Sequence, residues 1–506
     1  MSHDLGVPLA LSPGEVAFDR WRRRVGIVAT PVAVVAIALA DFPSLSPEAH
    51  RLAAVMVGVV LLWLSEALPM PVTALLGASA CVVAGVAPAK QVFAPFADPL
   101  MFLFIGSFIL AQGIFHHGLD KRVAYAVLAR PRVAASPTRL LLAFGLVAAV
   151  VSGWISNTAT TAMLFGIGLS MLRALYRGEL GARGALDPRW ATGLMLMIAF
   201  AASIGGLATP IGTPPNVIGL GFIRAELGIE VPFFSWMLVG VPVVVLMMLA
   251  LAGVMTLLSP AGVRRFPESA EITRAGAAAL GPWTRGQRSV VLAFAATVTL
   301  WILPGVLALA LGERDPLTQL VGARIPEGVA AMLGALLLFV LPGEGTARAI
   351  GWREAESIEW GVVLLYGGGF ALGTLAFTTG LAEAIGRGLT GYIPGGASGI
   401  GLLIASTLVA TLLSEATSNT ASANMVVPVV IAIANAAGSD PFLPALGATM
   451  GASLGFALPV STPCNAIVYG SGVVPLSRMI RAGLILDLIG VAVIVGVVSV
   501  VGPMLR

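Results

Sequence analysis

The sequence predicts an all-α polytopic membrane protein with about 11 transmembrane helices and two re-entrant hairpins. Of its 506 residues, 58% are hydrophobic and 11% are charged, and the mean hydropathy is +0.95. Soluble domains carry about 25% charged residues. Apolar stretches of roughly 20 residues, the length that crosses a bilayer, recur along the chain. This composition excludes a disordered chain, a nucleic-acid-binding module and an ordinary soluble enzyme.

The expected spans follow one another with short connections. We predict them at 25–41, 51–66, 70–88, 138–176, 191–226, 233–259, 288–312, 325–342, 397–437, 442–475 and 478–503. Two further stretches, 98–117 and 359–382, hold small residues at their midpoints, Gly106-Ser107 and Gly367-Gly368-Gly369. Each arm has about ten residues, too few to cross alone, which favours re-entrant hairpins. Ordinary spans with a glycine packing face are the alternative.

Basic residues set the expected topology. Arg20, Arg22, Arg23 and Arg24 precede the first span, and a second cluster runs from Lys121 to Arg139. The positive-inside rule places both clusters in the cytoplasm, which requires an even number of crossings between them. Three helices and one hairpin separate the clusters, so either the hairpin crosses or one helix does not. Residues 1–50 form an N-terminal segment with the first helix, and 261–287 form a polar linker.

An internal repeat divides the chain. Residues 152–163 are SGWISNTATTAM and residues 414–425 are SEATSNTASANM, an offset of 414 − 152 = 262. The same shift carries Gly106 to Gly368. The motifs TPPN at 213–216 and TPCN at 462–465 also correspond. We therefore predict two repeats, 51–260 and 288–506, the plan of many secondary transporters.

The Ser-Asn-Thr copies interrupt apolar stretches with residues that begin helices. Side chains of this type bond free amides at a helix start, and a break there exposes the positive end of a helix dipole to an anion. Interhelical hydrogen bonding is the alternative for a single copy. The prediction therefore covers both copies: Ser156, Asn157, Thr158, Ser418, Asn419 and Thr420.

The Thr-Pro-x-Asn motifs must unwind their helices, because proline lacks an amide proton. Carbonyls freed near Gly205, Gly212, Gly455 and Ser461 become ligands for a hard cation. No Arg or Lys occurs in 140–172, 191–223, 397–437 or 442–477. Anion binding there would depend on co-bound cations. Glu415 is the carboxylate in these stretches, and we expect a structural role for it, with proton coupling as the alternative.

With these motifs, the sequence resembles the divalent anion:sodium symporter (DASS) family, the INDY-type bacterial sodium/dicarboxylate transporters, from about residue 51 to 506. The resemblance implies a homodimer in the cell inner membrane that works by an elevator motion of a transport domain against a scaffold domain. Inverted repeats build each protomer. The implied substrates are C4-dicarboxylates such as succinate, malate and fumarate, or citrate, or sulfate. Sodium ions are the coupling ions, and no other cofactor is implied.

The resemblance also implies ligands by position. One sodium site would use Ser152, Ser156, Asn157 and Gly205, and the other Ser414, Thr417, Asn419 and Ser461. Both Ser-Asn-Thr motifs, Thr462 and Pro463 would bind the substrate. Ser414 stands where threonine is common in the family, and Thr417 and Ser461 stand where alanine occurs.

The predicted function is therefore sodium-coupled symport of a divalent anion, with membrane lipid as surroundings. A sodium-independent exchanger and a proton-coupled carrier are alternatives. A membrane-embedded enzyme would need a nucleophile with a base, paired carboxylates or a metal site, and the sequence offers no such group. A passive channel lined by broken helices is the remaining alternative.

Overall fold

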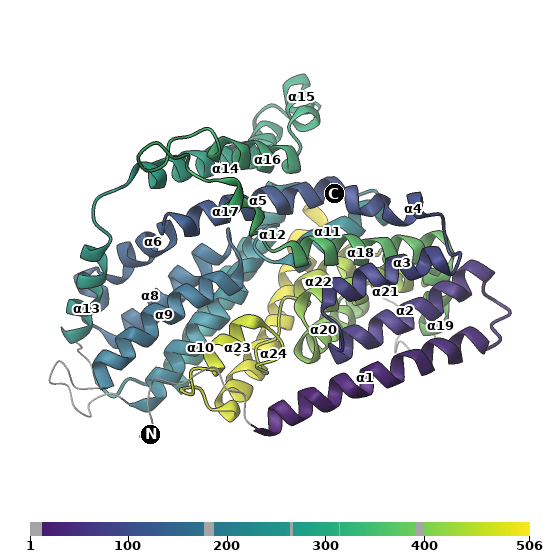
Figure 1. Cartoon of the computed structure of the whole chain (residues 1–506), viewed down its shortest axis with the longest axis horizontal. Coiled ribbons are helices and arrows are strands. Elements are labelled where there is room, and N and C mark those ends of the chain that lie inside the picture. The colour runs from purple at the N-terminus through teal and green to yellow at the C-terminus, as the bar shows by residue number, and fades with distance from the viewer. Residues whose placement is uncertain (1–12, 177–186, 264–266, 313, 391–398, 506) are drawn as a thin grey trace.

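The computed structural model describes residues 13–176, 187–263, 267–312, 314–390 and 399–505, and the secondary structure of these residues is helical (Figure 1). Nine helices in this part of the chain are long and apolar enough to cross a membrane, or ten if the bent pair α15–α16 is one span. The expected polytopic membrane fold is confirmed. The count differs from the predicted 11 because the expected spans 138–176 and 442–475 are each divided into two helices, and 70–88 contains a helix of 14 residues, while α5 and α18 are added.

The first half of the chain runs from α1 to α12. Its helices are α1 Pro13–Leu39, α2 Pro47–Ser65, α3 Met70–Val83, α4 Ala89–Phe93, η1 Ala94–Ala97, α5 Pro99–His116, α6 Leu119–Leu128, α7 Pro131–Ala134, α8 Pro137–Ser152, α9 Asn157–Tyr176, α10 Pro188–Gly205, η2 Gly206–Ala208, α11 Pro214–Leu227 and α12 Phe233–Leu258. The polar linker that follows contains a helix of its own, α13 Pro267–Ala279. Residues 1–12 of the predicted N-terminal segment lie outside the described residues.

The second half follows the same order of elements. Its helices are α14 Arg285–Leu311, α15 Pro316–Arg324, α16 Glu327–Leu338, α17 Trp352–Glu356, α18 Trp360–Thr378, α19 Leu381–Thr390, α20 Gly399–Ala416, α21 Asn419–Ala436, α22 Phe442–Gly451, α23 Pro463–Tyr469, α24 Leu476–Val501 and η3 Gly502–Leu505. Helices α6 and α19 begin 262 residues apart, as do α9 and α21 (381 − 119 and 419 − 157). The predicted sequence offset thus recurs in the helix boundaries.

The breaks predicted at the midpoints of 98–117 and 359–382 are wrong, because α5 and α18 each run as one helix through their glycines. A Cβ on Gly106 would lie 2.5 Å from the backbone of Ala331, and one on Gly368 would lie 2.9 Å from that of Ala74. These glycines allow close helix approach, which was the alternative interpretation.

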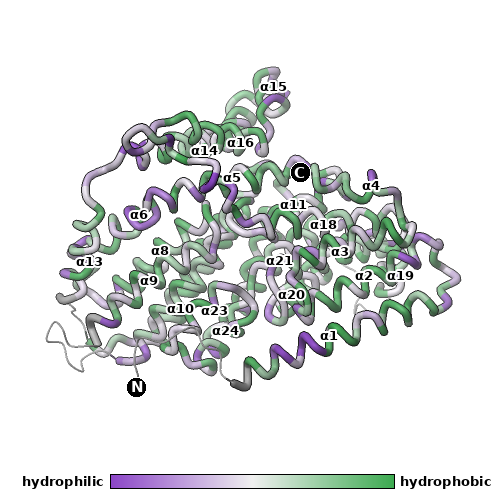
Figure 2. The backbone as a smooth tube through the Cα atoms, viewed as in Figure 1, coloured by the Kyte–Doolittle hydropathy of each residue, from purple (hydrophilic) through white to green (hydrophobic). Residues whose placement is uncertain are grey.

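This close packing crosses between the two halves. Helix α5 of the first half packs along α16 of the second, and α18 of the second half packs along α3 of the first. Helix α5 is long and apolar enough to cross. Together with the three predicted spans before it, it would give the even number of crossings that the two basic clusters require. Hydrophilic residues gather at the start of α1 and on α6 and α13 (Figure 2).

The breaks expected at the four motifs are confirmed. Helix α8 ends at Ser152 and α9 begins at Asn157, while α20 ends at Ala416 and α21 begins at Asn419. Prolines occupy the first turns of α11 and α23, after the irregular segments 209–213 and 452–462. Proline is tolerated at a helix start because its missing N–H has no intrahelical partner there.

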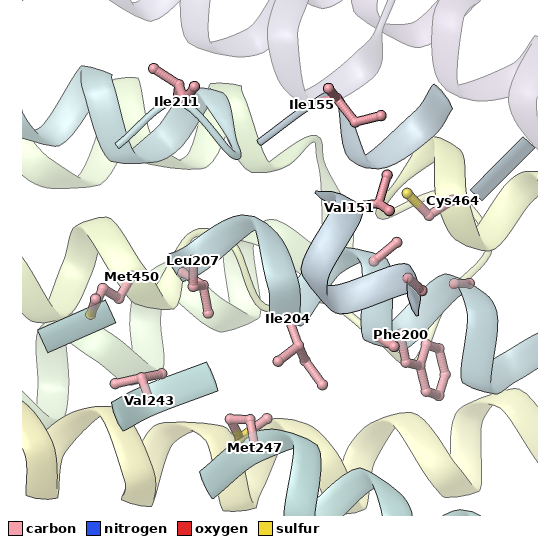
Figure 3. Packing of buried hydrophobic residues seen from close by; sticks show 14 of the residues in the cluster. Val151, Ile155, Phe200, Ile204, Leu207, Ile211, Val243, Met247, Met450 and Cys464 are labelled. Atoms are coloured by element: carbon pink, nitrogen blue, oxygen red, sulfur yellow. The ribbon is translucent and has the colours of Figure 1, made fainter. Parts of the chain in front are cut away.

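Buried hydrophobic side chains surround the first break (Figure 3). Val151 lies in the last turn of α8 and Ile155 in the turn that follows, while Ile204 lies in the last turn of α10 and Ile211 within the irregular segment 209–213. Cys464 of α23 belongs to the same hydrophobic core. The broken helices are therefore held by dense packing from several elements, which fixes the polar groups at their ends.

Candidate functional site

One cavity, of about 170 Å³, is lined by all four sequence motifs; we call it the central cavity. Its lining includes the predicted substrate residues Ser156, Asn157, Thr158, Ser418, Asn419, Thr420, Thr462 and Pro463, and the predicted sodium ligand Ser461. Four of the predicted sodium ligands do not line it: Ser152, Gly205, Ser414 and Thr417, all fully buried behind the cavity wall.

Neutral oxygens converge on Asn157 at the first break. With its amide nitrogen turned toward them, Asn157 donates to Ser152 Oγ at 2.5 Å and to the carbonyls of Ala202 and Gly212 at 3.1 Å. In the opposite orientation the amide oxygen faces the same group, and its contact to Ser152 Oγ is again 2.5 Å. Four uncharged oxygens can therefore meet at one point, which is the ligand chemistry of a hard cation.

The other predicted members of this first sodium set act differently. Gly205 matters through its lack of a side chain, because a Cβ there would lie 2.2 Å from the carbonyl oxygen of Ala149 on α8. The hydroxyl of Ser156 points away from the oxygen group and donates to Oε1 of Glu359 at 3.2 Å. The structure therefore brings Ser152 and Asn157 together and leaves Ser156 on the cavity side.

The second break repeats the arrangement around Asn419. Ser414 Oγ lies 2.8 Å from both Asn419 Oδ1 and the carbonyl of Ala452, and Asn419 Nδ2 donates to the carbonyl of Ser453 at 3.4 Å. The hydroxyl of Thr417 instead donates to the last turn of α20, to the carbonyl of Leu413 at 2.8 Å. Three of these oxygens are carbonyl or amide oxygens, again suited to a hard cation.

Ser461 belongs to the irregular segment rather than to the Asn419 group. Its hydroxyl lies 2.8 Å from the carbonyl of Gly455 and 2.7 Å from that of Leu458. Gly455 has φ +141°, a conformation open to glycine, and a Cβ there would lie 3.2 Å from Ser414 Oγ. Ser461 and Gly455 therefore shape the backbone beside the second oxygen group.

The last residue of each Thr-Pro-x-Asn motif fixes the irregular segment before it. Asn216 Nδ2 donates to the carbonyls of Gly206 and Thr209 at 2.9 and 2.8 Å. Asn465 Nδ2 donates to the corresponding carbonyls of Gly455 and Leu458 at 3.1 and 3.0 Å. Both asparagines are fully buried. They hold the freed carbonyls in place, a role that the motif pattern alone did not assign.

Sequence reasoning missed Glu359 and Phe108, which also line the central cavity. Glu359 directly precedes α18, and Phe108 lies in the middle of α5, so both come from the helices that were expected to be hairpins. A carboxylate at the edge of an apolar stretch was the available signal for Glu359. Its negative charge beside an anion site would have to be offset by a cation or a proton.

Glu415 lies outside the central cavity and serves the irregular segment of the second half. Its Oε1 accepts from the amide of Ala457 at 2.7 Å, and its Oε2 accepts from that of Leu458 at 3.0 Å. Asp487 of α24 lies beside Glu415 and accepts from the amide of Phe456 at 3.4 Å. Three successive backbone amides thus have carboxylate partners, which supports the expected structural role.

The electrostatics of the central cavity come from helix ends. Helices α9, α11, α21 and α23 all begin at residues in or next to its lining, and no Arg or Lys is among the described residues that line it. Helix starts carry partial positive charge, which favours anions. The arrangement can therefore hold a small anion between two polar loops, with a neutral-oxygen group behind each loop.

Comparison with known proteins agrees with this chemistry. A profile described as "Sodium:sulfate symporter transmembrane region" matches residues 19–506. A protein of Staphylococcus saprophyticus named sodium-dependent dicarboxylate transporter SdcS is 31% identical over 485 residues, covering 95% of this chain and 91% of that protein. The protein of the same name from Staphylococcus aureus is 31% identical over 487 residues, with the same coverage.

Two solved structures share the fold. The YdaH transporter of Alcanivorax borkumensis has a TM-score of 0.52 at 14% sequence identity, covering 97% of this chain and 99% of that one. The Neisseria gonorrhoeae protein MtrF has a TM-score of 0.54 at 16% identity, covering 83% and 85%. At these identities the likeness concerns the fold alone.

Proposed function

The chain belongs to the sodium:sulfate symporter family and is a multi-pass membrane transporter, and from this premise we propose that it couples sodium entry to the uptake of a C4-dicarboxylate. One observation carries the proposal: two neutral-oxygen groups, at Asn157 and Asn419, lie behind one cavity. The described residues that line this cavity include no Arg or Lys. Without bound cations, the negative charge of an anion in this cavity would not be compensated.

The two polar loops favour a dicarboxylate. Each loop starts a helix, α9 or α21, and each helix start suits one carboxylate group. The names of the staphylococcal relatives point to the same substrate class. Sulfate has a single anionic centre and would use this pair of sites less fully, while citrate adds a third carboxylate.

For the mechanism, we propose alternating access by an elevator motion in the inner membrane. A transport domain carrying the broken helices would move against a scaffold domain, with a homodimer as the working unit. The two repeats, 51–260 and 288–506, would be related by inverted topology. The recurrence of helix starts at an offset of 262 supports the repeats, and the other parts of this mechanism are what the sequence resemblance implies.

The decisive experiment is radiolabelled succinate uptake into proteoliposomes, with an inward sodium gradient or an equal potassium gradient, and with or without internal succinate. Concentrative uptake into empty vesicles with sodium only is the expected result. Uptake that requires internal succinate and ignores sodium would identify an exchanger instead.

Two variants test the site itself. Asn157→Ala and Asn419→Ala should each lower uptake more than tenfold while the protein elutes as a folded species, because each removes one oxygen from a cation group. Asn435→Ala is the matched control, since Asn435 lies exposed at the far end of α21. Normal uptake by both site variants would refute the assignment.

A further inference from the structure

A second cavity, of about 410 Å³, lies where three helix ends meet. It is formed by the start of α10, the end of α12 and the start of α24. Its polar lining is dominated by Arg189, Arg478 and Arg481, so we call it the arginine cavity. It shares no lining residue with the central cavity.

The arginine cavity carries excess positive charge. Arg189 is bonded to Asp187, with nitrogen-to-Oδ2 distances of 2.7 and 2.9 Å, and this contact holds the pKa of the Asp187 carboxyl below its usual range. Arg478 and Arg481 lie one turn apart on α24, and neither makes an ion pair among the described residues. No described residue lining the cavity has a carboxylate. An anion is the complementary ligand, and the starts of α10 and α24 add to the attraction.

Apolar surface continues from the arginines along the same helices. On α24, Leu484 and Leu488 follow Arg481 at three and seven residues, on one helix face, and their exposed fractions are 51% and 68%. On α12, Leu257 beside the cavity is 81% exposed. An anionic group with a long apolar tail matches this pattern, because its head would meet the arginines and its tail the leucines. A free inorganic anion would leave the apolar part unused.

The position of α10 gives the side of the membrane. The indole of Trp190, next to Arg189, donates to the carbonyl of Pro137 at 3.3 Å, so α10 and α8 begin at the same level. Helix α8 follows the basic cluster that ends at Arg139, which the positive-inside rule places in the cytoplasm. The cytoplasmic leaflet is the one rich in anionic lipid, and basic pockets between transmembrane helices bind such headgroups.

We propose that the arginine cavity binds the headgroup of an anionic phospholipid of the cytoplasmic leaflet, with the acyl chains lying along Leu257, Leu484 and Leu488. Arg478 and Arg481 hold the phosphate, and Arg189 is positioned beside them by Asp187. The inference concerns lipid binding alone and is independent of the transported substrate.

The test is a native mass spectrometry titration of the whole purified protein with phosphatidylglycerol or phosphatidylcholine of identical acyl chains. Phosphatidylglycerol should bind at least tenfold more tightly. Arg478→Gln/Arg481→Gln should weaken phosphatidylglycerol binding about 25-fold, since each arginine near an anionic lipid contributes about fivefold. Binding of phosphatidylcholine should be unchanged.

Three controls make the result specific. Arg274→Gln removes one exposed cation from α13 in the polar linker and should leave phosphatidylglycerol binding as in the original protein. The single variant Arg481→Gln changes an exposed side chain, so it can replace the double variant if the latter unfolds. It should weaken phosphatidylglycerol binding about fivefold. Arg481→Lys keeps the charge and should restore most of the affinity.

Equal affinity for the two lipids, or unaltered phosphatidylglycerol binding by the arginine variants, would overturn the proposal. A competition experiment with inorganic phosphate distinguishes a free anion from a phospholipid as the occupant of the cavity. If phosphate displaces phosphatidylglycerol completely at matched concentration, the cavity is a site for free anions and the phospholipid assignment fails. Weak competition by phosphate is the expected result.

Discussion

The two Ser-Asn-Thr loops have the same sequence core and each separates two helices, yet different neighbours hold them. The first loop contains Trp154, whose ring stacks on Phe233 at 6.2 Å and meets Phe294 edge-on at 5.5 Å. The equivalent of Trp154 in the second half is Ala416, the last residue of α20 (154 + 262 = 416), and Glu415 bonds the adjacent irregular segment instead.

The serines of the two loops differ in the same way. Ser156 donates to the carboxylate of Glu359, whereas Ser418 donates to the sulfur of Met70 at 3.0 Å. A shared polar motif therefore fixes the binding groups, while unrelated neighbours set the stability and charge of each side. The following substitutions separate these two contributions.

The largest effect is expected from Glu415→Ala. It should lower the free energy of unfolding by about 4 kcal/mol, because the backbone amides of Ala457 and Leu458 lose charge-assisted hydrogen bonds. Chemical denaturation in detergent measures the change, with Glu48→Ala at an exposed position as the control. Glu415→Gln sharpens the result: a structural carboxylate predicts lower stability with an unaltered pH profile of uptake. A flattened profile at normal stability would identify a proton-coupling group.

Trp154→Ala should lower the free energy of unfolding by about 3 kcal/mol. This value is at the lower end for the loss of a large aromatic side chain, because Trp154 is half-buried. The loss should come from the first loop alone, so hydrogen exchange should speed up around residues 153–156 and stay unchanged around 417–418. Trp21→Ala, at a position 60% exposed, is the comparison. Equal loosening of both loops would show that they do not have separate supports.

Glu359→Gln should lower the KM for succinate roughly tenfold, equivalent to about 1.4 kcal/mol, because it removes a negative charge beside the anion site. The hydrogen bond from Ser156 can persist, so kcat should change little. Glu356→Gln, three residues earlier and exposed, provides the control in the same uptake assay. A higher KM would mean that the carboxylate contributes favourably to binding.

The smallest effect concerns Glu344, which supports α14, the helix that carries Phe294. Its carboxylate accepts from the amide of Gly286 at 3.1 Å, and this bond lowers the pKa of Glu344 below its usual value. A lowered pKa stabilises the folded state above the unfolded pKa, and this contribution is lost as the pH falls through the folded pKa. Glu344→Gln should therefore lower the Tm slightly at neutral pH, with the difference from the original protein vanishing in acid.

The sequence predicted the broken helices correctly because their causes are local. Proline at the start of α11 and α23 forbids a continuous helix, and Ser418 caps α21 through a bond to the amide of Ala421 at 3.2 Å. These rules act over three or four residues, so a single chain is enough to apply them.

The errors came from features that depend on distant partners. The glycines of α5 and α18 were interpreted as breaks, but their meaning is set by Ala331 and Ala74, which lie on helices of the other half. Glu359 reaches the central cavity through the placement of α18, which no local pattern specifies. The three arginines of the arginine cavity lie on elements almost 300 residues apart (481 − 189 = 292) and meet through folding alone.

The crossed packing of α5 with α16 has a consequence for synthesis. Gly106 and its contact Ala331 are separated by 331 − 106 = 225 residues. At about 5–20 residues per second, the ribosome needs roughly 10 to 45 seconds to produce the partner after α5 has emerged. During that interval α5 stays in the membrane with its glycine face uncovered, so the first half cannot complete its assembly until the first helices of the second half, α14 to α16, have been inserted.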